Sequence, residues 1–377
     1  MAIMWVACGW DLGAARADDE RISLRAELGA EYDSNVHRTE ELPGAGGAVG
    51  SPLGRAVLGW SASDRLGHGQ DVAFSLLGAS KVFAAQDARS ENVGIIESGG
   101  SWRIATGART RLGVSAAYYE AIQAGTQAEQ QLSGEARDFR SLAPVARFQS
   151  GVGDGGMVTV GGGYRWFRFK PNHDYDFGAP VLSAEYQLTR ESADGSVDWD
   201  LAAGAGVELR RFVGARLVRQ TTDCAPDSCP LLPDAAGTVH QDQFVSGHAS
   251  LTRTGKVLLG LGYALQWNRS NSYAETLLRH VGTLRFTAPL PLGVYLAARA
   301  ELVYVTYADR VTLLGGRSGQ AYATIDDENR SQARAELSRD LSTRLQLIAR
   351  YSLYVNPLGQ LHYRRQTATL SLAFTID

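Results

Sequence analysis

The stretch that decides the fold is RISLRAELGAEY, residues 21–32. Its even positions are apolar or small, from Ile22 to Tyr32, and its odd positions are charged or small, from Arg21 to Glu31. Successive side chains of a β-strand point to opposite faces, so a period of two predicts a strand with one apolar and one polar face.

The same alternation returns along the whole chain, for example at 197–209, 257–267, 294–304 and 345–355. The region 92–104 alternates weakly, so 14 or 18 strands also fit the pattern. Counting the alternating runs and the turns between them predicts about sixteen strands, at 21–33, 54–64, 71–84, 92–104, 111–123, 138–150, 157–169, 178–190, 197–212, 243–253, 257–268, 277–289, 293–308, 330–340, 344–355 and 361–376.

The length of these runs indicates a membrane protein. They are roughly 10–16 residues long, whereas strands in soluble domains average about 5–6 residues. A tilted strand needs about 9–11 residues to cross a bilayer. A closed barrel pairs every backbone group between strands, so only lipid has to cover its apolar face.

The connections alternate in length in the same way. Short turns such as 65–70 and 253–256 are separated by long polar loops such as 214–242 and 309–329. Outer-membrane barrels have short periplasmic turns and long external loops. We therefore predict an all-β fold, a transmembrane antiparallel β-barrel of the cell outer membrane, with residues 18–377 as a single domain.

Aromatic residues offer a second test, because membrane barrels carry aromatic girdles at both interfaces. Eight aromatic side chains are predicted on apolar faces near strand ends: Trp60, Tyr118, Trp166, Tyr186, Trp199, Trp267, Tyr304 and Phe374. The alternative is the general enrichment of aromatic residues in strands.

The N-terminal segment and the cysteines predict export. Residues 1–17 end in Ala15-Arg16-Ala17 before an acidic patch, which resembles the end of a signal peptide. In an exported loop, Cys224 and Cys229 are predicted to form a small disulfide. A metal site is the disfavoured alternative, because only Asp223 and Asp227 accompany the two thiols.

The charges lie on the polar faces. The chain has 37 Lys+Arg and 40 Asp+Glu, a net charge of −3 that argues against a nucleic-acid partner. A charge facing lipid near the bilayer centre costs about 2–4 kcal/mol, so charged strand residues are expected to point inward. Strand parity predicts these pore-lining residues: Arg25, Glu27, Arg147, Arg165, Glu185, Arg210, Arg285, Arg299, Glu301, Arg334, Glu336, Arg350 and Arg365.

Such a lining has two interpretations. It is either a network of ion pairs that holds the barrel rigid or a charged passage. Forked guanidinium groups suit carboxylate and sulfate groups, which favours an acidic solute for the second interpretation. Nothing in the sequence indicates a cofactor.

Catalysis is the third possibility, because some outer-membrane barrels are hydrolases with a histidine beside a serine or carboxylate at one rim. His173 and His240 are the histidines that lie beside a carboxylate in a long loop. An ordinary loop histidine is the favoured interpretation of both, and we predict that the protein is not an enzyme.

A short motif at the end of the first predicted strand carries a resemblance. The sequence YDSNV at 32–36 resembles the close of the first strand in a broad group of bacterial outer-membrane barrels. That group includes barrels encoded with exopolysaccharide-export systems and the barrel domain of surface-lipoprotein assembly modifiers. The modifiers carry a periplasmic helical-repeat domain before the barrel, and about twenty residues precede the first strand here, which disfavours that branch.

The last strand resembles the signal read by the barrel-assembly machinery, carried by Thr367, Thr369, Leu372 and Phe374. It departs from that signal by having Thr369 where glycine is usual and by continuing to Asp377. The resemblance of the YDSNV motif to export-associated barrels implies a porin-like conduit for a secreted polysaccharide in a Gram-negative outer membrane, with periplasmic export components as partners. The alternatives are a passive diffusion porin for small solutes and a rim-active hydrolase.

Overall fold

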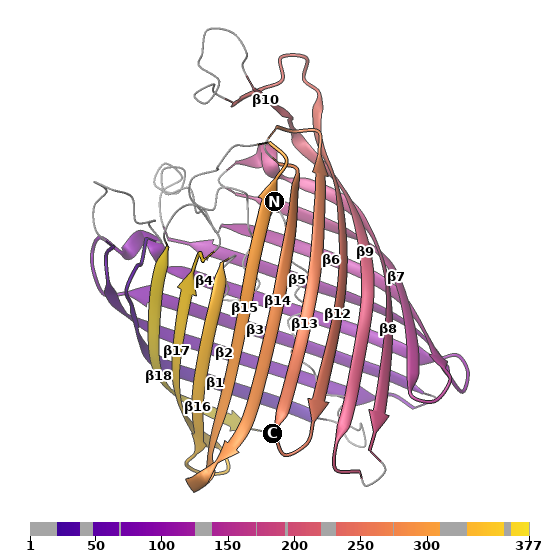
Figure 1. The fold of residues 1–377 in the computed structure, drawn as a ribbon, viewed down its shortest axis with the longest axis vertical. Coiled ribbons are helices and arrows are strands. Elements are labelled where there is room, and N and C mark those ends of the chain that lie inside the picture. The colour runs from indigo at the N-terminus through magenta and orange to yellow at the C-terminus, as the bar shows by residue number, and fades with distance from the viewer. Residues whose placement is uncertain are drawn as a thin grey trace.

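The computed structural model describes residues 21–37, 48–67, 69–124, 138–170, 172–192, 195–219, 231–273, 275–309, 330–357 and 363–376. The predicted signal peptide at 1–17 lies outside these residues. Sixteen long antiparallel strands close into one barrel (Figure 1). They are β1 (Arg21–Asp33), β2 (Ser51–Arg65), β3 (Gln70–Phe83), β4 (Val93–Ala105), β5 (Thr110–Gln123), β6 (Phe139–Val152), β7 (Gly156–Phe169), β8 (Phe177–Glu191), β9 (Asp198–Ala215), β12 (Val239–Thr254), β13 (Leu258–Ser270), β14 (Leu277–Leu290), β15 (Val294–Tyr307), β16 (Ser331–Asp340), β17 (Leu345–Val355) and β18 (Arg364–Ile376).

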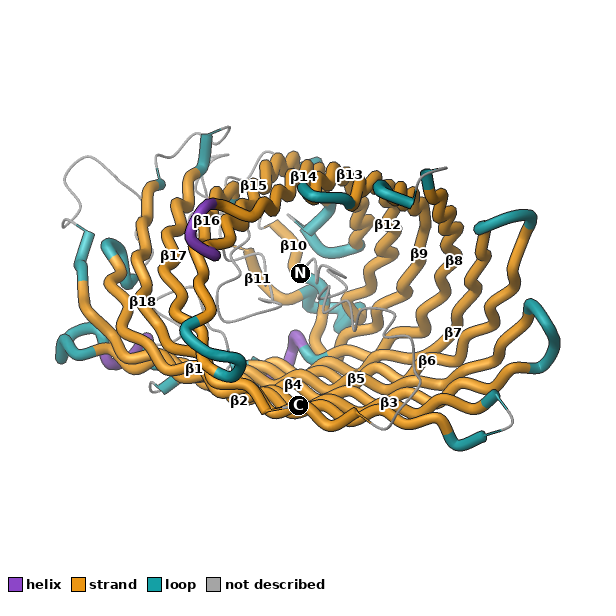
Figure 2. Tube along the Cα trace, turned by 90° about the horizontal axis from the view of Figure 1, so that it is seen from below, coloured by secondary structure: helices purple, strands orange, loops and turns teal. Residues whose placement is uncertain are grey.

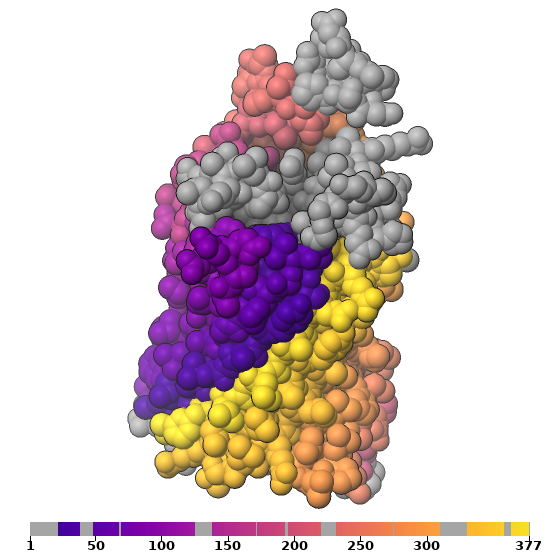
Figure 3. All heavy atoms as spheres, turned by 90° about the vertical axis from the view of Figure 1, so that its left-hand side faces the viewer, coloured from indigo at the N-terminus to yellow at the C-terminus, as the bar shows by residue number. Residues whose placement is uncertain are grey.

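The barrel closes where its first and last strands meet. β1 pairs with β2 on one side and with β18 on the other, with Ala26 opposite Phe374 and Ala30 opposite Leu370. Figure 3 shows this seam as indigo strands lying directly against yellow ones. Closure leaves no free sheet edge, so the backbone groups of the strands pair with one another as a lipid environment requires.

Viewed along the barrel, the wall is flattened, with β1–β5 on one long side and β12–β16 on the other (Figure 2). Three short 3-10 helices lie between the strands: η1 (Arg89–Glu91), η2 (His173–Tyr175) and η3 (Pro291–Gly293). Among the described residues there is no helix with the length and apolar character needed to span a membrane.

The outer surface is apolar. Leu28, Leu182 and Leu370 lie near the middle of their strands and are 67%, 66% and 57% exposed, whereas Glu27 and Thr369, beside two of them in sequence, are buried. One face of each strand points outward and the other inward, so the large apolar side chains cover the outside. Lipid covers such a surface without cost, whereas a water-exposed apolar area of this size would drive association.

All eight aromatic residues predicted for the girdles lie on the outward parity of their strands. Tyr118, Trp166, Trp267 and Tyr304 lie toward the long-loop ends of their strands. The other four, Trp60, Tyr186, Trp199 and Phe374, lie toward the short-turn ends. This separation into two belts is the arrangement expected at the two membrane interfaces.

The strand prediction is confirmed, including its weakest member. The region predicted at 92–104 is β4, and it pairs with β3 and β5 along its whole length. Ser98 and Gly100 point outward and Gly99 inward, so small residues on both faces remove the hydropathy period without disturbing the backbone pairing.

A hairpin of two short strands was not among the predicted strands. The longest loop contains a small hairpin of β10 (Leu217–Arg219) and β11 (Leu231–Pro233), which stands beyond the long-loop end of the barrel (Figure 1). Asp234 follows it and accepts hydrogen bonds from the Ala236 backbone and the Arg216 side chain. A hydrogen bond with the Thr238 side chain, followed by these two, lowers the pKa of the Asp234 carboxyl to about 2. The turn after β11 is therefore built around an ionised carboxylate.

Placing a charge on the outer face tests the membrane assignment. We expect Leu182→Arg to destabilise the folded barrel in lipid vesicles by about 2–4 kcal/mol, because the guanidinium would sit in hydrocarbon near the middle of β8. Unfolding in urea, followed by tryptophan fluorescence, measures the loss. The control is Leu341→Arg in the short turn after β16, where the leucine is 52% exposed. Equal stability of the two variants would contradict the assignment.

Candidate functional site

The candidate site is the inner wall of the barrel. The inward positions of the strands carry all thirteen charged residues that strand parity predicts, on the face opposite the exposed apolar side chains. They fall into two classes. Glu27, Arg165, Arg210, Glu301, Arg350 and Arg365 are buried, whereas Arg25, Arg147, Glu185, Arg285, Arg299, Arg334 and Glu336 are partly or fully exposed.

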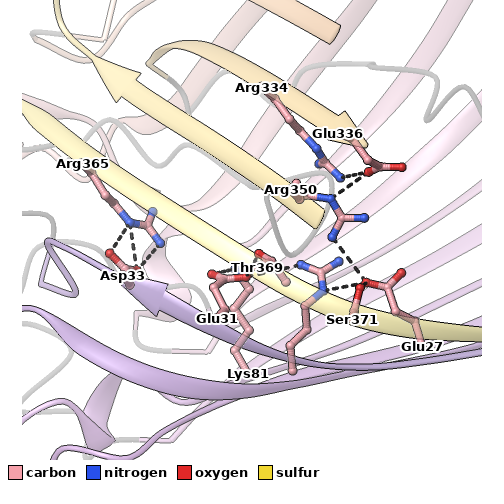
Figure 4. Close-up of polar contacts among 11 residues, drawn as sticks. Glu27, Glu31, Asp33, Lys81, Arg334, Glu336, Arg350, Arg365, Thr369 and Ser371 are labelled. Atoms are coloured by element: carbon pink, nitrogen blue, oxygen red, sulfur yellow. Dashed lines mark hydrogen bonds and ion pairs between the residues drawn. The ribbon is translucent and has the colours of Figure 1, made fainter. Parts of the chain in front are cut away.

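The buried charges nearest the barrel closure form what we call the seam network (Figure 4). It consists of Glu27, Glu31, Asp33, Arg55, Lys81, Arg350 and Arg365. Its strongest pair is Asp33 with Arg365, from β1 and β18. Arg365 Nε lies 2.9 and 3.0 Å from the two carboxylate oxygens, and its Nη2 lies 2.6 Å from Oδ2. The Asp33 carboxylate is fully buried, and it also accepts a hydrogen bond from the Asn35 backbone. A bidentate pair of this kind is strong because both hydrogen bonds are charge-assisted and in fixed geometry.

Glu31 is the second centre of the seam network. One carboxylate oxygen lies 2.8 Å from Lys81 Nζ on β3, and the other accepts a hydrogen bond of 3.0 Å from Thr369 on β18. Arg55 on β2 approaches the same carboxylate at 3.9 Å. Glu31 therefore connects β1 to β18, β2 and β3, and Figure 4 shows its contacts with Lys81 and Thr369.

Glu27 is the third centre of the network, four residues from Glu31 toward the short-turn end of β1. It lies 3.5 Å from Arg55 Nε and 3.3 Å from Arg350 Nη1, and it accepts a hydrogen bond of 3.0 Å from Ser371. Arg350 also donates to Glu336 at 2.8 Å, which extends the network from β1 to β16. Burying charges is costly unless they are paired and hydrogen-bonded, and each carboxylate here meets that condition.

The opposite part of the wall holds a second group of buried charges. The Glu208 carboxylate on β9 lies 2.7 Å from Arg210 Nε and 3.2 Å from Arg165 Nη1. The Arg210 guanidinium lies 4.5 Å from the ring centre of Phe244 and 5.3 Å from that of Phe177. Contact with ring faces stabilises a desolvated guanidinium, so these charges are held in place by pairing and packing.

Beside this group runs an aromatic band across adjacent strands β5 to β12. Neighbouring ring centres lie 5.2, 5.4, 5.0, 5.1 and 3.9 Å apart in the order Tyr119, Phe139, Phe167, Phe177, Phe212, His240. The four phenylalanines are almost fully buried. They give this part of the inner wall a packed apolar cluster with Ile95 and Ala179. The band makes one side of the long-loop half of the barrel apolar, while the seam network makes the other side ionic.

The water-exposed charges include a row of three arginines. In the register of β14, β15 and β16, Arg285 is directly opposite Arg299, and Arg299 is directly opposite Arg334. Arg299 lies 2.8 Å from Glu301 and Arg334 lies 3.4 Å from Glu336, yet the two arginine side chains remain 33% and 28% exposed. Like charges directly opposite each other repel. Three arginines side by side therefore make the electrostatic potential of this part of the inner wall positive, even though Arg299 and Arg334 each have a carboxylate partner.

Across the barrel, the exposed group is mixed. The Glu185 carboxylate lies 3.2 Å from His248 Nε2 and accepts a hydrogen bond of 2.6 Å from Gln187. Arg147 on β6, two strands away, donates a hydrogen bond to Ser115 on β5. Exposed pairs of this kind contribute little to stability, so their side chains remain available to water and solutes.

The two histidines of the hydrolase hypothesis are placed differently. His173 is largely exposed, and its Nδ1 lies 3.1 Å from Asp176, not beside its sequence neighbour Asp174. His240 Nε2 lies 2.8 Å from Asp242 and 3.1 Å from the Ser270 hydroxyl. A catalytic histidine uses one ring nitrogen for the serine and the other for the carboxylate. His240 uses one nitrogen for both, and its ring is stacked on Phe212.

Cys224 and Cys229 lie outside the described residues, so their pairing stays a prediction. Among the residues described, no group of three or more His, Cys, Asp or Glu side chains has the arrangement to hold a metal ion.

Sequence reasoning missed several members of the seam network: Glu31, Asp33, Arg55 and Lys81. The same parity that predicts Glu27 as inward also places Glu31 and Asp33 on that face, so a signal for these two was present. The pairing of Arg55 and Lys81 with them depends on the register between strands, which alternation does not reveal.

Comparison with known proteins supports the fold. No family model matches the chain, and no curated protein sequence matches it. The chain is similar to the solved structure of Pseudomonas putida OprB, with a TM-score of 0.52 and 12% identity over 95% of this chain and 94% of that one. It also matches Pseudomonas aeruginosa OccK2, with a TM-score of 0.40 and 14% identity over 96% and 98% of the two chains. The likeness to OprB shows the fold, a closed β-barrel of the kind found in outer-membrane proteins.

Proposed function

We propose that this barrel is a conduit for acidic solutes across the outer membrane. The observation that carries the proposal is the inward arginine row, aligned across three adjacent strands, in which Arg285 is exposed and Arg299 and Arg334 are partly exposed. Guanidinium groups bind carboxylate, sulfate and phosphate groups through forked hydrogen bonds. A wall with this charge raises the local concentration of anions and disfavours cations.

The burial of the inner wall supports small solutes as the cargo. Inward side chains in the long-loop half, such as Asp33, Arg210 and Phe167, are at most 1% exposed, whereas those of the arginine row are exposed or partly exposed. Little of the inner wall in that half contacts water, which favours a restricted passage over a wide one. A passive diffusion porin for small acidic solutes is therefore the first candidate.

Export of a secreted polysaccharide is the second candidate. Its support is the YDSNV motif at the end of β1, which resembles that of barrels encoded with such systems. The arginine row favours an acidic polymer over a neutral one, because only a charged chain gains from it. Both candidate functions are non-enzymatic. The contacts of His173 and His240 support this, because neither histidine has a serine on one ring nitrogen and a carboxylate on the other.

Planar-bilayer recording separates the candidates. We expect the purified protein to form ion-conducting pores, and galacturonate to reduce the ion current at concentrations where the matched neutral sugar galactose does not. Alginate, a polymer of acidic sugars, is the probe for the second candidate, and block by alginate alone would favour it over the small-solute porin. The absence of measurable conductance from folded protein would contradict both.

A further inference from the structure

A second charged feature lies on the outside of the barrel and plays no part in the proposed passage. Arg140 on β6 and Arg168 on β7 are directly opposite each other in the register of the two strands. Both point outward and both are exposed. They lie at the long-loop end of the wall, two residues beyond Leu142 and Trp166, which face the lipid on the same strands. The two guanidiniums are thus at the level where lipid headgroups begin, just above the aromatic belt.

The carboxylates near this pair are engaged by another cation. Glu120 on β5 is opposite Arg140 in register, but its two oxygens contact Lys170 Nζ at 2.9 Å and the Tyr118 hydroxyl at 2.7 Å. Lys170 also lies 2.9 Å from Asp138. Within the part of the chain that the structure describes, neither Arg140 nor Arg168 has an ion pair or a hydrogen bond from its side chain. Lys170 therefore makes the close contacts with both carboxylates, and Arg140 interacts with Glu120 only through longer-range electrostatics.

Like charges directly opposite on adjacent strands destabilise a sheet, and an anion between them removes the repulsion. We propose that Arg140 and Arg168 form a clamp for a phosphate group of a phosphorylated glycolipid in the outer leaflet. Two adjacent guanidinium groups offer several donors to phosphate oxygens in a charge-assisted geometry. The position above Trp166 suits a lipid whose acyl chains lie along the apolar wall below while its phosphate reaches the clamp.

The test uses the full chain, folded in dodecyl maltoside micelles and titrated with bisphosphorylated lipid A, with bound lipid counted by native mass spectrometry. We expect the double variant R140Q/R168Q to bind lipid A about tenfold or more weakly, since that is the effect of losing a single charge-assisted hydrogen bond. The matched control is R211Q/R269Q, which removes two outward, exposed arginines at the long-loop ends of β9 and β13 that are not opposite another arginine. This control is expected to bind like the wild type.

Heat-modifiable gel mobility shows that each variant is folded before the titration. Lipid A stripped of both phosphates is expected to bind the wild type no better than it binds R140Q/R168Q. Equal affinity of the wild type and R140Q/R168Q for the bisphosphorylated lipid would overturn the clamp. Equal loss in the two double variants would also overturn it, because the effect would then be one of general surface charge. Inorganic phosphate alone is expected to leave lipid A bound at millimolar concentration, and its complete displacement of the lipid would overturn the assignment to a lipid headgroup.

Discussion

Replacing Asp33 with alanine is expected to destabilise the barrel by about 3–5 kcal/mol, the cost of removing one partner from a buried ion pair. The Asp33 carboxylate is fully buried and makes three contacts shorter than or equal to 3.0 Å with Arg365. Without it, the buried guanidinium loses its bidentate partner and the Asn35 backbone loses an acceptor. Urea unfolding in lipid vesicles, with cold and heated gel mobility as the readout of folding, measures the loss.

Two further variants make this result specific. Glu185→Ala removes an inward carboxylate whose pair with His248 is exposed, and it should change the free energy of unfolding by less than about 1 kcal/mol. The double variant D33A/R365M removes both charges while keeping an unbranched apolar side chain in place of Arg365. It should recover much of the stability, because a well-packed apolar replacement for a buried pair is often neutral. A loss in D33A no larger than that in E185A would show that the seam network does not stabilise the barrel.

The triple variant R285Q/R299Q/R334Q is expected to abolish the preference of the pore for anions. The three arginines are opposite one another in the register of β14, β15 and β16, and their side chains are exposed or partly exposed. Each charge contributes on the order of 1 kcal/mol to an anion about 4 Å away even at the dielectric constant of water. Together they should change the ratio of anion to cation permeability by about tenfold or more. The reversal potential across a planar bilayer with a salt gradient measures this ratio directly.

A matched variant removes three arginines from the outer face, R211Q/R269Q/R339Q, where the side chains point away from the barrel interior and are exposed. It should leave the reversal potential unchanged. If the inner and outer triple variants shift it equally, the selectivity comes from the charge of the whole protein. If neither shifts it, the arginine row is not part of the ion path.

The division between inside and outside was predictable, because it depends on nothing but a period of two within each strand. Leu28 outward and Glu27 inward follow from the first strand alone. What each inward charge does was not predictable. Arg165 and Arg210 have the same parity signal as Arg299, yet the first two are buried against Glu208 and the last remains partly exposed.

The reason lies in the register and in the curvature of the barrel. Asp33 and Arg365 are 332 residues apart in sequence, and only the offset between β1 and β18 brings them together. The aromatic band has the same origin, because its rings come from six different strands. Alternation within a strand contains no information about the stagger between strands, so the pairing of side chains had to come from the structure.

The position of the seam network has a consequence for how the chain folds. Glu27, Glu31 and Asp33 contact Ser371, Thr369 and Arg365 across the whole length of the barrel sequence. Joining segments so far apart carries a large entropic cost before any contact is gained. Until β1 and β18 meet, the acidic side chains of β1 lack these three partners. Their meeting gives Asp33 its cation and gives Glu27 and Glu31 a hydroxyl donor each, so closure of the barrel completes the hydrogen bonding of all three carboxylates.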